Sequence, residues 1–333
     1  MFSSLTGFGA AQKLLSLCHD LEVERFPLQA DIDTSGVSVL RLDRIHPVLS
    51  GNKLFKLLCH WQPWQGSGRS GWVTPGGVWS NHLHAVAFLG QWAGVRTTGL
   101  VRGYDDVPLT ATLQDCVDWG MQLVFQSRVD YRQRYDPDWQ RHWSAATDSY
   151  FIGEGGAWAA STEMALLSGL DGDDQQDPGA QAFAALAAVC AGYDQVWLAA
   201  GSGTTAERLL PRLPADVHLV AVNTVADHGA LAQRWQRLFA GRSWQIVASS
   251  MRRFGAQSDA LRGQITAFDR QGLPLDPVYG APLVDTWLQH AALWQGQSVL
   301  LIHGGGLQGR RGIGLDVDVS AEGQVDQVRP LGQ

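Results

Sequence analysis

The sequence is poor in lysine and has no excess of positive charge. Only three of its 25 basic residues are lysines, Lys13, Lys53 and Lys56, and the other 22 are arginines. The formal net charge of −7 argues against a general binder of nucleic acids or anionic membranes, because such proteins need a basic surface. No apolar run reaches the roughly 18 residues that would span a bilayer.

Cysteines are also few, and none of them forms a paired motif. Cys18, Cys59, Cys116 and Cys190 are scattered, which favours unpaired thiols in a reducing compartment and provides no zinc-binding pattern. Residues 1–20 lack a positively charged segment followed by a long apolar stretch, so a secretory signal is not expected. We therefore expect a cytoplasmic protein.

The chain does contain an alternation of strand and helix patterns. Its 333 residues are 45% hydrophobic, which is enough for a sizeable core in about two domains. Strands are predicted at 37–44, 71–77, 96–103, 121–127, 217–225 and 297–306, helices at 54–61, 81–92, 109–119 and 181–191, and a strand, glycine loop and helix at 194–210. This alternation predicts an α/β fold with mostly parallel open sheets flanked by helices. An acidic loop at 171–179 is expected to be solvated.

Two of the three lysines lie close together. Lys53 and Lys56 fall within the run Ser50-Gly51-Asn52-Lys53-Leu54-Phe55-Lys56. Arginine replaces lysine in most surface roles but cannot act as an amine nucleophile, because it does not deprotonate. The pair therefore indicates either a need for an amine or chance survival in an arginine-rich chain.

A glycine loop follows the predicted strand near residue 196. It reads Gly201-Ser202-Gly203-Thr204-Thr205 and is followed by a helix. Small residues let backbone N–H groups approach an anion at a helix N-terminus, and the two threonines add hydroxyl donors. The loop is neither a Walker A loop nor a GxGxxG fingerprint. It indicates a site for one phosphate monoester, or else a tight turn with glycines for packing.

Three further motifs lie at predicted strand ends or turns. Gly76 to His84 follows a strand, and either Ser80 or Asn81 can cap the next helix or face a ligand. Asp276 to Tyr279 is a turn that places a phenol after a proline, either for packing or for chemistry. His303 to Gly306 ends an apolar strand. In open α/β sheets, ligands bind at the carboxyl ends of strands. His82 and His84 are two residues apart, which disfavours a shared metal site, and we expect no metal.

In this order, the motifs resemble one family: the pyridoxal-phosphate enzymes of the tryptophan synthase β fold, in the 1-aminocyclopropane-1-carboxylate (ACC) deaminase/D-cysteine desulfhydrase group. The family pattern begins with Gly-Asn-Lys-x-x-Lys-Leu, matched from Gly51 to Leu57, and a Gly-Gly-x-x-Ser-Asn-His/Gln loop, matched from Gly76 to His82. The phosphate loop from Gly201 to Thr205, Asp276 to Tyr279 and His303 to Gly306 follow. The resemblance covers roughly residues 37–306.

The resemblance implies a role for each motif. Lys53 would carry the cofactor, pyridoxal 5'-phosphate, covalently, and Asn81 would hydrogen-bond its ring hydroxyl. Ser80 and Tyr279 would act on the substrate. Ser80, Asn81, His82 and Tyr279 would together bind the substrate, and Gly201, Ser202, Gly203, Thr204 and Thr205 would bind the cofactor's phosphate.

The chain departs from the family at two positions that can supply a partner to the cofactor's pyridine nitrogen. Gly280 stands where the deaminases have an acid and the desulfhydrases a hydroxyl residue. Gly304 stands where a threonine is usual. The sequence therefore names no partner for that nitrogen. In addition, Trp79 would crowd the substrate side.

The resemblance also implies an organisation and an activity. A small domain at 55–160 would be inserted into a large cofactor-binding domain made of 1–54 and 161–333. The implied activity is that of a lyase or deaminase on a small amino acid, closest to D-cysteine desulfhydrase, which releases keto acid, ammonia and sulfide. ACC deaminase is the alternative activity, and a cofactor-binding protein with little or no catalysis is the alternative class. The expected partners are the small amino-acid substrate and a second copy of the chain in a dimer.

Overall fold

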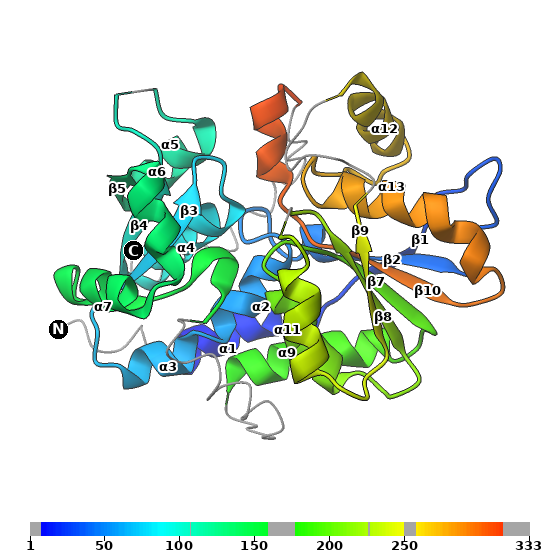
Figure 1. The fold of residues 1–333 in the computed structure, drawn as a ribbon, viewed down its shortest axis with the longest axis horizontal. Coiled ribbons are helices and arrows are strands. Elements are labelled where there is room, and N and C mark those ends of the chain that lie inside the picture. The colour runs from blue at the N-terminus through cyan, green and yellow to red at the C-terminus, as the bar shows by residue number, and fades with distance from the viewer. Residues whose placement is uncertain (1–7, 107, 159–176, 226, 250–257, 316–333) are drawn as a thin grey trace.

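A computed structural model describes residues 8–106, 108–158, 177–225, 227–249 and 258–315. Two β-sheets, each flanked by helices, make up the fold (Figure 1). Within the described residues, no helix has both the length and the apolar character needed to cross a membrane. The part of the acidic loop at 171–176 lies outside the described residues.

The larger sheet has six strands in the order β1-β2-β10-β7-β8-β9. Their bounds are β1 (Val23–Arg25), β2 (Val37–Arg41), β7 (Gln195–Ala200), β8 (His218–Asn223), β9 (Trp244–Ala248) and β10 (Val299–His303). All neighbours pair in parallel except β1, which runs antiparallel to β2 at the edge. Strands that are distant in sequence are therefore adjacent, as βαβ crossovers require.

Successive residues of the central strand β7 face opposite sides of this sheet. Val196 and Leu198 pack into a core shared with the helix α9 (Pro178–Cys190), whereas Trp197 packs into a second core shared with α12 (Asp259–Asp269) and α13 (Gly280–His290). Strand side chains alternate with a period of two, and both faces are covered, so an apolar run rather than an alternating one forms this strand. Figure 1 shows α12 and α13 on one side of the sheet, and α9 and α11 (Ala230–Leu238) on the other.

The smaller sheet has the order β5-β4-β3-β6, with every pair parallel. Its strands are β3 (Gly71–Gly77), β4 (Arg96–Arg102), β5 (Gln122–Gln126) and β6 (Ser149–Phe151). They all come from one continuous stretch, 71–151, whereas the strands of the larger sheet lie on both sides of it. The domain boundaries at 54/55 and 160/161 stay a prediction.

The α-helices of the described residues connect and cover these strands. They are α1 (Phe8–Ser16), α2 (Asn52–Leu58), α3 (Trp61–Gly66), α4 (Asn81–Ala93), α5 (Ala111–Asp118), α6 (Arg128–Tyr131), α7 (Pro137–Ala146), α9 (Pro178–Cys190), α10 (Thr204–Leu209), α11 (Ala230–Leu238), α12 (Asp259–Asp269) and α13 (Gly280–His290). Short 3-10 helices include η3 (Glu154–Gly156) and η6 (Leu307–Ile313).

The predicted alternation is confirmed for the strands and helices named from the sequence, with two differences. The helix expected at 54–61 begins earlier and is split into α2 and α3. Residues 128–149, a polar and aromatic stretch for which the sequence predicts no helix, contain helices α6 and α7, which are capped at their starts by Ser127 and Asp136. Capping side chains satisfy the free N–H groups of a first turn, so short polar segments can be helical without a long apolar stripe.

Candidate functional site

The start of α2 is docked against the loop that follows β10. The backbone N–H of Asn52 donates to the Gly304 carbonyl at 3.1 Å. Gly51 has φ +77°, and a Cβ added there would overlap the Gly304 carbonyl oxygen. Only glycine allows this conformation at such a close approach. The loop continues to Gly306, where an added Cβ would overlap Asn81 Nδ2. Two motifs far apart in sequence, those of Lys53 and Asn81, are thus held against one loop.

The amine of Lys53 is largely shielded from solvent. Its side chain is only partly exposed, and its Nζ donates to Asn52 Oδ1 at 2.7 Å and lies 5.9 Å from the centre of the Tyr279 ring. Burial lowers the pKa of Lys53 to about 8, although the nearby Asp276 carboxylate opposes the shift. A pKa of about 8 leaves about a tenth of the amine neutral at pH 7, far more than in an ordinary lysine, and the neutral amine is the form that adds to carbonyl groups.

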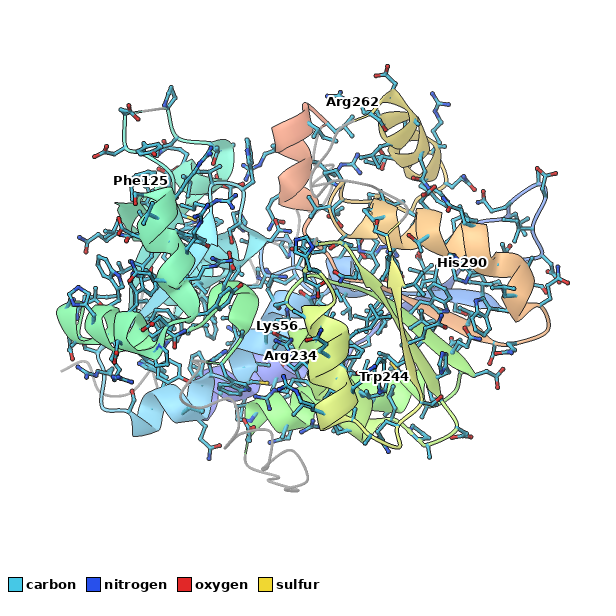
Figure 2. All side chains as sticks on the ribbon, viewed as in Figure 1. Lys56, Phe125, Arg234, Trp244, Arg262 and His290 are labelled. Carbon is cyan, nitrogen blue, oxygen red and sulfur yellow. The ribbon has the colours of Figure 1, made fainter. Side chains whose placement is uncertain are left out.

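Lys56, one turn further along α2, is more deeply buried. Its Nζ donates to the Gly155 carbonyl at 3.1 Å, and its aliphatic stem packs against Gly156 in η3. Burial first, and then the neighbouring Lys53, hold the pKa of Lys56 well below its ordinary value. Figure 2 shows Lys56 toward the middle of the molecule. The sequence motif therefore supplies two unusual amines, of which Lys53 is the one next to Tyr279.

The loop after β3 contains three of the predicted site residues, Ser80, Asn81 and His82, and each has different surroundings. Ser80 is the N-cap of α4, and its Oγ accepts from Leu83 N at 3.2 Å, so its capping role is confirmed. Asn81 Oδ1 is buried and has no hydrogen-bond partner among the described residues. The His82 ring is buried and shares a hydrogen bond of 2.8 Å with Thr74 Oγ1 in β3. Substrate contacts by Ser80 and His82 stay predictions.

The two neighbouring histidines have separate partners. His84 Nε2 lies 3.1 Å from Asp115 Oδ2 in α5, whereas His82 bonds to Thr74. Within the described parts of the chain, no group of three or more histidines, cysteines or carboxylates is arranged to hold a metal ion.

The glycine loop lies between β7 and α10. Gly203 has φ +82°, and a Cβ there would overlap Leu231 Cδ1 of α11. Ser202 Oγ and Thr204 Oγ1 lie 2.9 Å apart and share a hydrogen bond. Thr205 Oγ1 is buried, and no residue that the structure describes is its hydrogen-bond partner. Because the first N–H groups of a helix have no partner within the helix, this loop offers both backbone and hydroxyl donors to an anion.

Tyr279 lies between the glycine loop and Lys53. A Cβ added at Gly201 would lie 3.2 Å from both the Tyr279 hydroxyl and its ring edge. Burial raises the pKa of Tyr279 above its ordinary value, and the nearby carboxylates of Asp276 and Glu154 raise it further. The phenol therefore keeps its proton at neutral pH. The structure brings Lys53, Tyr279 and the glycine loop together.

Asp276 is predicted from the sequence only as part of a turn. It is 1% exposed and accepts from the backbone N–H groups of Val278 at 2.9 Å, Tyr279 at 2.8 Å and Gly280 at 2.6 Å. A Cβ added at Gly280 would lie 2.9 Å from Asp276 Oδ2. Burial raises the pKa of Asp276, although the three N–H donors oppose the rise. The carboxyl fixes the Tyr279 turn at the start of α13.

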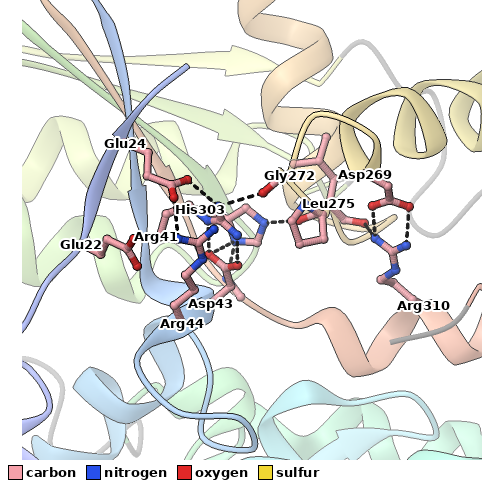
Figure 3. Close-up of polar contacts among 12 residues, drawn as sticks. Glu22, Glu24, Arg41, Asp43, Arg44, Asp269, Gly272, Leu275, His303 and Arg310 are labelled. Atoms are coloured by element: carbon pink, nitrogen blue, oxygen red, sulfur yellow. Dashed lines mark hydrogen bonds and ion pairs between the residues drawn. The ribbon is translucent and has the colours of Figure 1, made fainter. Parts of the chain in front are cut away.

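A buried polar network fixes the loop after β10 (Figure 3). Arg41, at the end of β2, donates to both oxygens of Asp43 at 2.9 and 2.7 Å and to the Gly272 carbonyl at 3.0 Å. His303 Nε2 donates to the Pro274 carbonyl at 2.6 Å, and its Nδ1 lies 3.3 Å from Asp43 Oδ1. His303 thus has a positioning role, because it ties β10 to the segment that precedes Asp276.

Arg310 also holds the segment that precedes Asp276. Arg310, in η6, donates to both oxygens of Asp269 at 2.8 and 2.6 Å and to the Leu275 carbonyl at 3.3 Å. Burial opposes ionisation of Asp43, but His303 and Arg41 more than offset it and hold the pKa of Asp43 below its ordinary value. Arg41, Asp43 and Arg310 lie outside the motifs, and only their clustering after apolar strands could have drawn attention to them.

Comparisons with known proteins give a clear result for structure and none for sequence. No protein-family model matches the chain, and no curated protein matches it. An ACC deaminase homologue has a similar structure, with TM-score 0.65, 19% identity, and coverage of 91% of this chain and 98% of that one.

Two further solved structures are similar over most of their length. A pyridoxal 5'-phosphate-dependent aspartate racemase has TM-score 0.56 and 12% identity, with coverage of 90% of this chain and 94% of its own. O-ureido-L-serine synthase has TM-score 0.60 and 13% identity, with coverage of 92% and 98%. At such identities the likeness shows the fold alone. It confirms the predicted fold class, with two mostly parallel sheets flanked by helices.

Proposed function

We propose that this chain is a pyridoxal 5'-phosphate-dependent lyase that acts on a small amino acid, with D-cysteine as the substrate it is best suited to. One observation carries the proposal: Lys53 has a lowered pKa and lies beside Tyr279, and the Tyr279 ring packs on the glycine loop. The fold shared with a pyridoxal 5'-phosphate-dependent racemase and an ACC deaminase homologue supports it.

The described residues fit the cofactor. The buried oxygens Asn81 Oδ1 and Thr205 Oγ1 have no partner in the part of the chain that the structure describes, and buried polar atoms of native proteins are nearly always hydrogen-bonded. Asn81 would hold the ring hydroxyl, Gly201 to Thr205 would hold the phosphate, and Lys53 would hold the aldehyde carbon. Bound pyridoxal phosphate supplies an electron sink for negative charge at the substrate's α-carbon.

The residues of the chain then have distinct tasks. Lys53 Nζ lies 5.9 Å from the centre of the Tyr279 ring and would be suited to take a proton from the substrate's α-carbon. Tyr279 keeps its hydroxyl proton and can donate a hydrogen bond to the departing thiol. Ser80 Oγ accepts from Leu83 N, and its hydroxyl proton is available to the substrate carboxylate. D-Cysteine and water would give pyruvate, hydrogen sulfide and ammonia.

A screen of substrates tests the proposal. Purified protein loaded with pyridoxal phosphate is mixed with D- and L-amino acids, and keto acid and sulfide are measured. We expect D-cysteine to give both products at equal rates. Bound pyridoxal phosphate whose visible spectrum stays unchanged on adding every amino acid, with no release of product, would instead support the class of binding proteins with little or no catalysis. Protein that binds no pyridoxal phosphate would contradict the proposal.

A change at Gly203 tests the phosphate loop. Gly203→Val forces a β-branched residue into a left-handed conformation, at about 1–3 kcal/mol of strain, and against Leu231. We expect the affinity for pyridoxal phosphate to fall at least about tenfold, or about 1.4 kcal/mol, in an absorbance titration. A folded variant with unchanged affinity would show that Gly203 serves only packing. Gly241→Val, which also has positive φ but open space around it, is the matched control.

We further propose a cytoplasmic homodimer, on the basis of the scattered free cysteines and the enzyme class. All four cysteines are buried and unpaired. Light scattering of the purified protein at several concentrations measures the oligomeric state, and a monomer at every concentration would contradict this proposal.

A further inference from the structure

An ion pair between helices α10 and α11 holds the glycine loop on the side that faces α11. Arg234, in α11, donates from Nη2 to the Ser202 carbonyl at 2.7 Å. It also donates to the Glu207 carboxylate of α10, from Nε at 2.8 Å and from Nη2. Glu207 is buried and accepts a third hydrogen bond, from Trp235 Nε1 at 2.8 Å. One guanidinium therefore ties a carbonyl of the loop to a fixed carboxylate.

The geometry of the peptide bond determines what this contact does to the loop. The Ser202 carbonyl and the Gly203 N–H belong to one planar trans peptide, so they point in opposite directions. The carbonyl points to Arg234, and the N–H therefore points away from α11. Gly203 has φ +82° and cannot easily relax to another conformation with its neighbours Leu231 and Arg234 in place. The guanidinium thus fixes the direction of a donor in the loop.

We propose that Arg234 is a positioning residue that orients the glycine loop for the phosphate group of the cofactor, and this inference rests on the proposed function. The contribution of Arg234 is orientation rather than net charge, because Glu207 neutralises it. Removing it lets the Ser202–Gly203 peptide rotate, and the site loses a preorganised donor to the phosphate. The donors that hold the ring and the aldehyde belong to Asn81 and Lys53, and they are unaffected.

A purely structural role makes a different prediction. If the ion pair only holds α10 against α11, its loss weakens the whole site and lowers the affinity for every ligand alike. Pyridoxal has the ring and aldehyde of the cofactor but no phosphate. The ratio of the affinities for pyridoxal phosphate and pyridoxal therefore separates the two roles, and it does so independently of the folded fraction of the protein.

The experiment uses three variants of the full chain, stripped of cofactor. Arg234→Met/Glu207→Gln removes both charges, so that no buried carboxylate is left unpaired, and keeps an acceptor for Trp235. Arg234→Lys is a milder change that retains a single donor group. Arg237→Met is the matched control, because Arg237 lies on the exposed face of the same helix. Absorbance titrations give the Kd for pyridoxal phosphate and for pyridoxal.

We expect the double variant to raise the Kd for pyridoxal phosphate roughly tenfold, with a smaller rise for Arg234→Lys. The Kd for pyridoxal should change less than about twofold, and Arg237→Met should change neither. An unchanged ratio of the two affinities in both Arg234 variants would overturn the positioning role while leaving the proposed function intact. Wild-type protein that binds neither ligand would overturn both.

Discussion

Replacing Lys53 with alanine is expected to abolish covalent attachment of pyridoxal phosphate and to lower the rate of keto-acid release at least about a thousandfold, equal to about 4 kcal/mol of transition-state stabilisation. Burial gives Lys53 a pKa of about 8, and its Nζ lies beside Tyr279. Borohydride reduction of the loaded wild-type protein, followed by peptide mapping, should find the label on Lys53.

The other two lysines are the natural controls for this experiment. Lys56→Met removes the second buried amine and should leave the label on Lys53. Lys13→Arg changes an exposed side chain in α1 and should change nothing. A label on Lys56 in the wild type, or loss of the label only in Lys56→Met, would mean that the two amines have exchanged roles.

The lowered pKa of Lys53 also predicts how attachment depends on pH. Only the neutral amine adds to the aldehyde, so the rate of attachment should rise through a pH of about 8 and level off above it. An amine with an unshifted lysine pKa would keep gaining rate up to a pH of about 10.4. Stopped-flow absorbance after mixing stripped protein with cofactor measures the profile, and a rate that still climbs at pH 10 would contradict the shift.

The positions of the motifs could be predicted from the sequence because each is a glycine-rich or polar segment at the end of an apolar strand. The carboxyl ends of parallel strands share one edge of a sheet, so Gly201 and His303 had to lie near each other. The contact between Gly51 and Gly304 could not be predicted, because it depends on two backbones of distant segments. The positive φ of Gly51 shows why glycine is required there.

The supporting residues escaped sequence reasoning for a different reason. Arg234 lies within an ordinary amphipathic helix, and no local pattern distinguishes it from the exposed Arg237. Its role follows only from the packing of α11 against α10, which places it beside the Ser202 carbonyl. The sequence pattern predicts Asp276 as a turn residue, and it is one, but its carboxylate near Lys53 also opposes part of the lowering of the Lys53 pKa.

The absence of side chains at Gly280 and Gly304 predicts which small amino acid is used well. A carboxylate at either position could hold the cofactor's ring nitrogen protonated, because an opposite charge nearby favours the cation. Asp276 lies beside Gly280, but both of its oxygens already accept backbone N–H groups. Without such a group, loss of a good leaving group such as a thiol remains feasible, whereas opening an unactivated cyclopropane does not. We expect sulfide release from D-cysteine to exceed ammonia release from ACC at least about a hundredfold, or about 3 kcal/mol.

Restoring one side chain tests this explanation. A Cβ at Gly304 would meet only Asn52 Nδ2, at an ordinary 3.6 Å, whereas one at Gly280 would crowd Asp276. Gly304→Asp therefore adds a carboxylate where the structure has room, and Gly304→Asn is the matched control of similar shape without the charge. Kinetic assays of each variant should show a higher ratio of ACC to D-cysteine turnover for Gly304→Asp than for Gly304→Asn. Efficient ammonia release from ACC by the unmodified protein would contradict the prediction. It would mean that another residue interacts with the ring nitrogen, and Asp276→Asn would be the first variant to test.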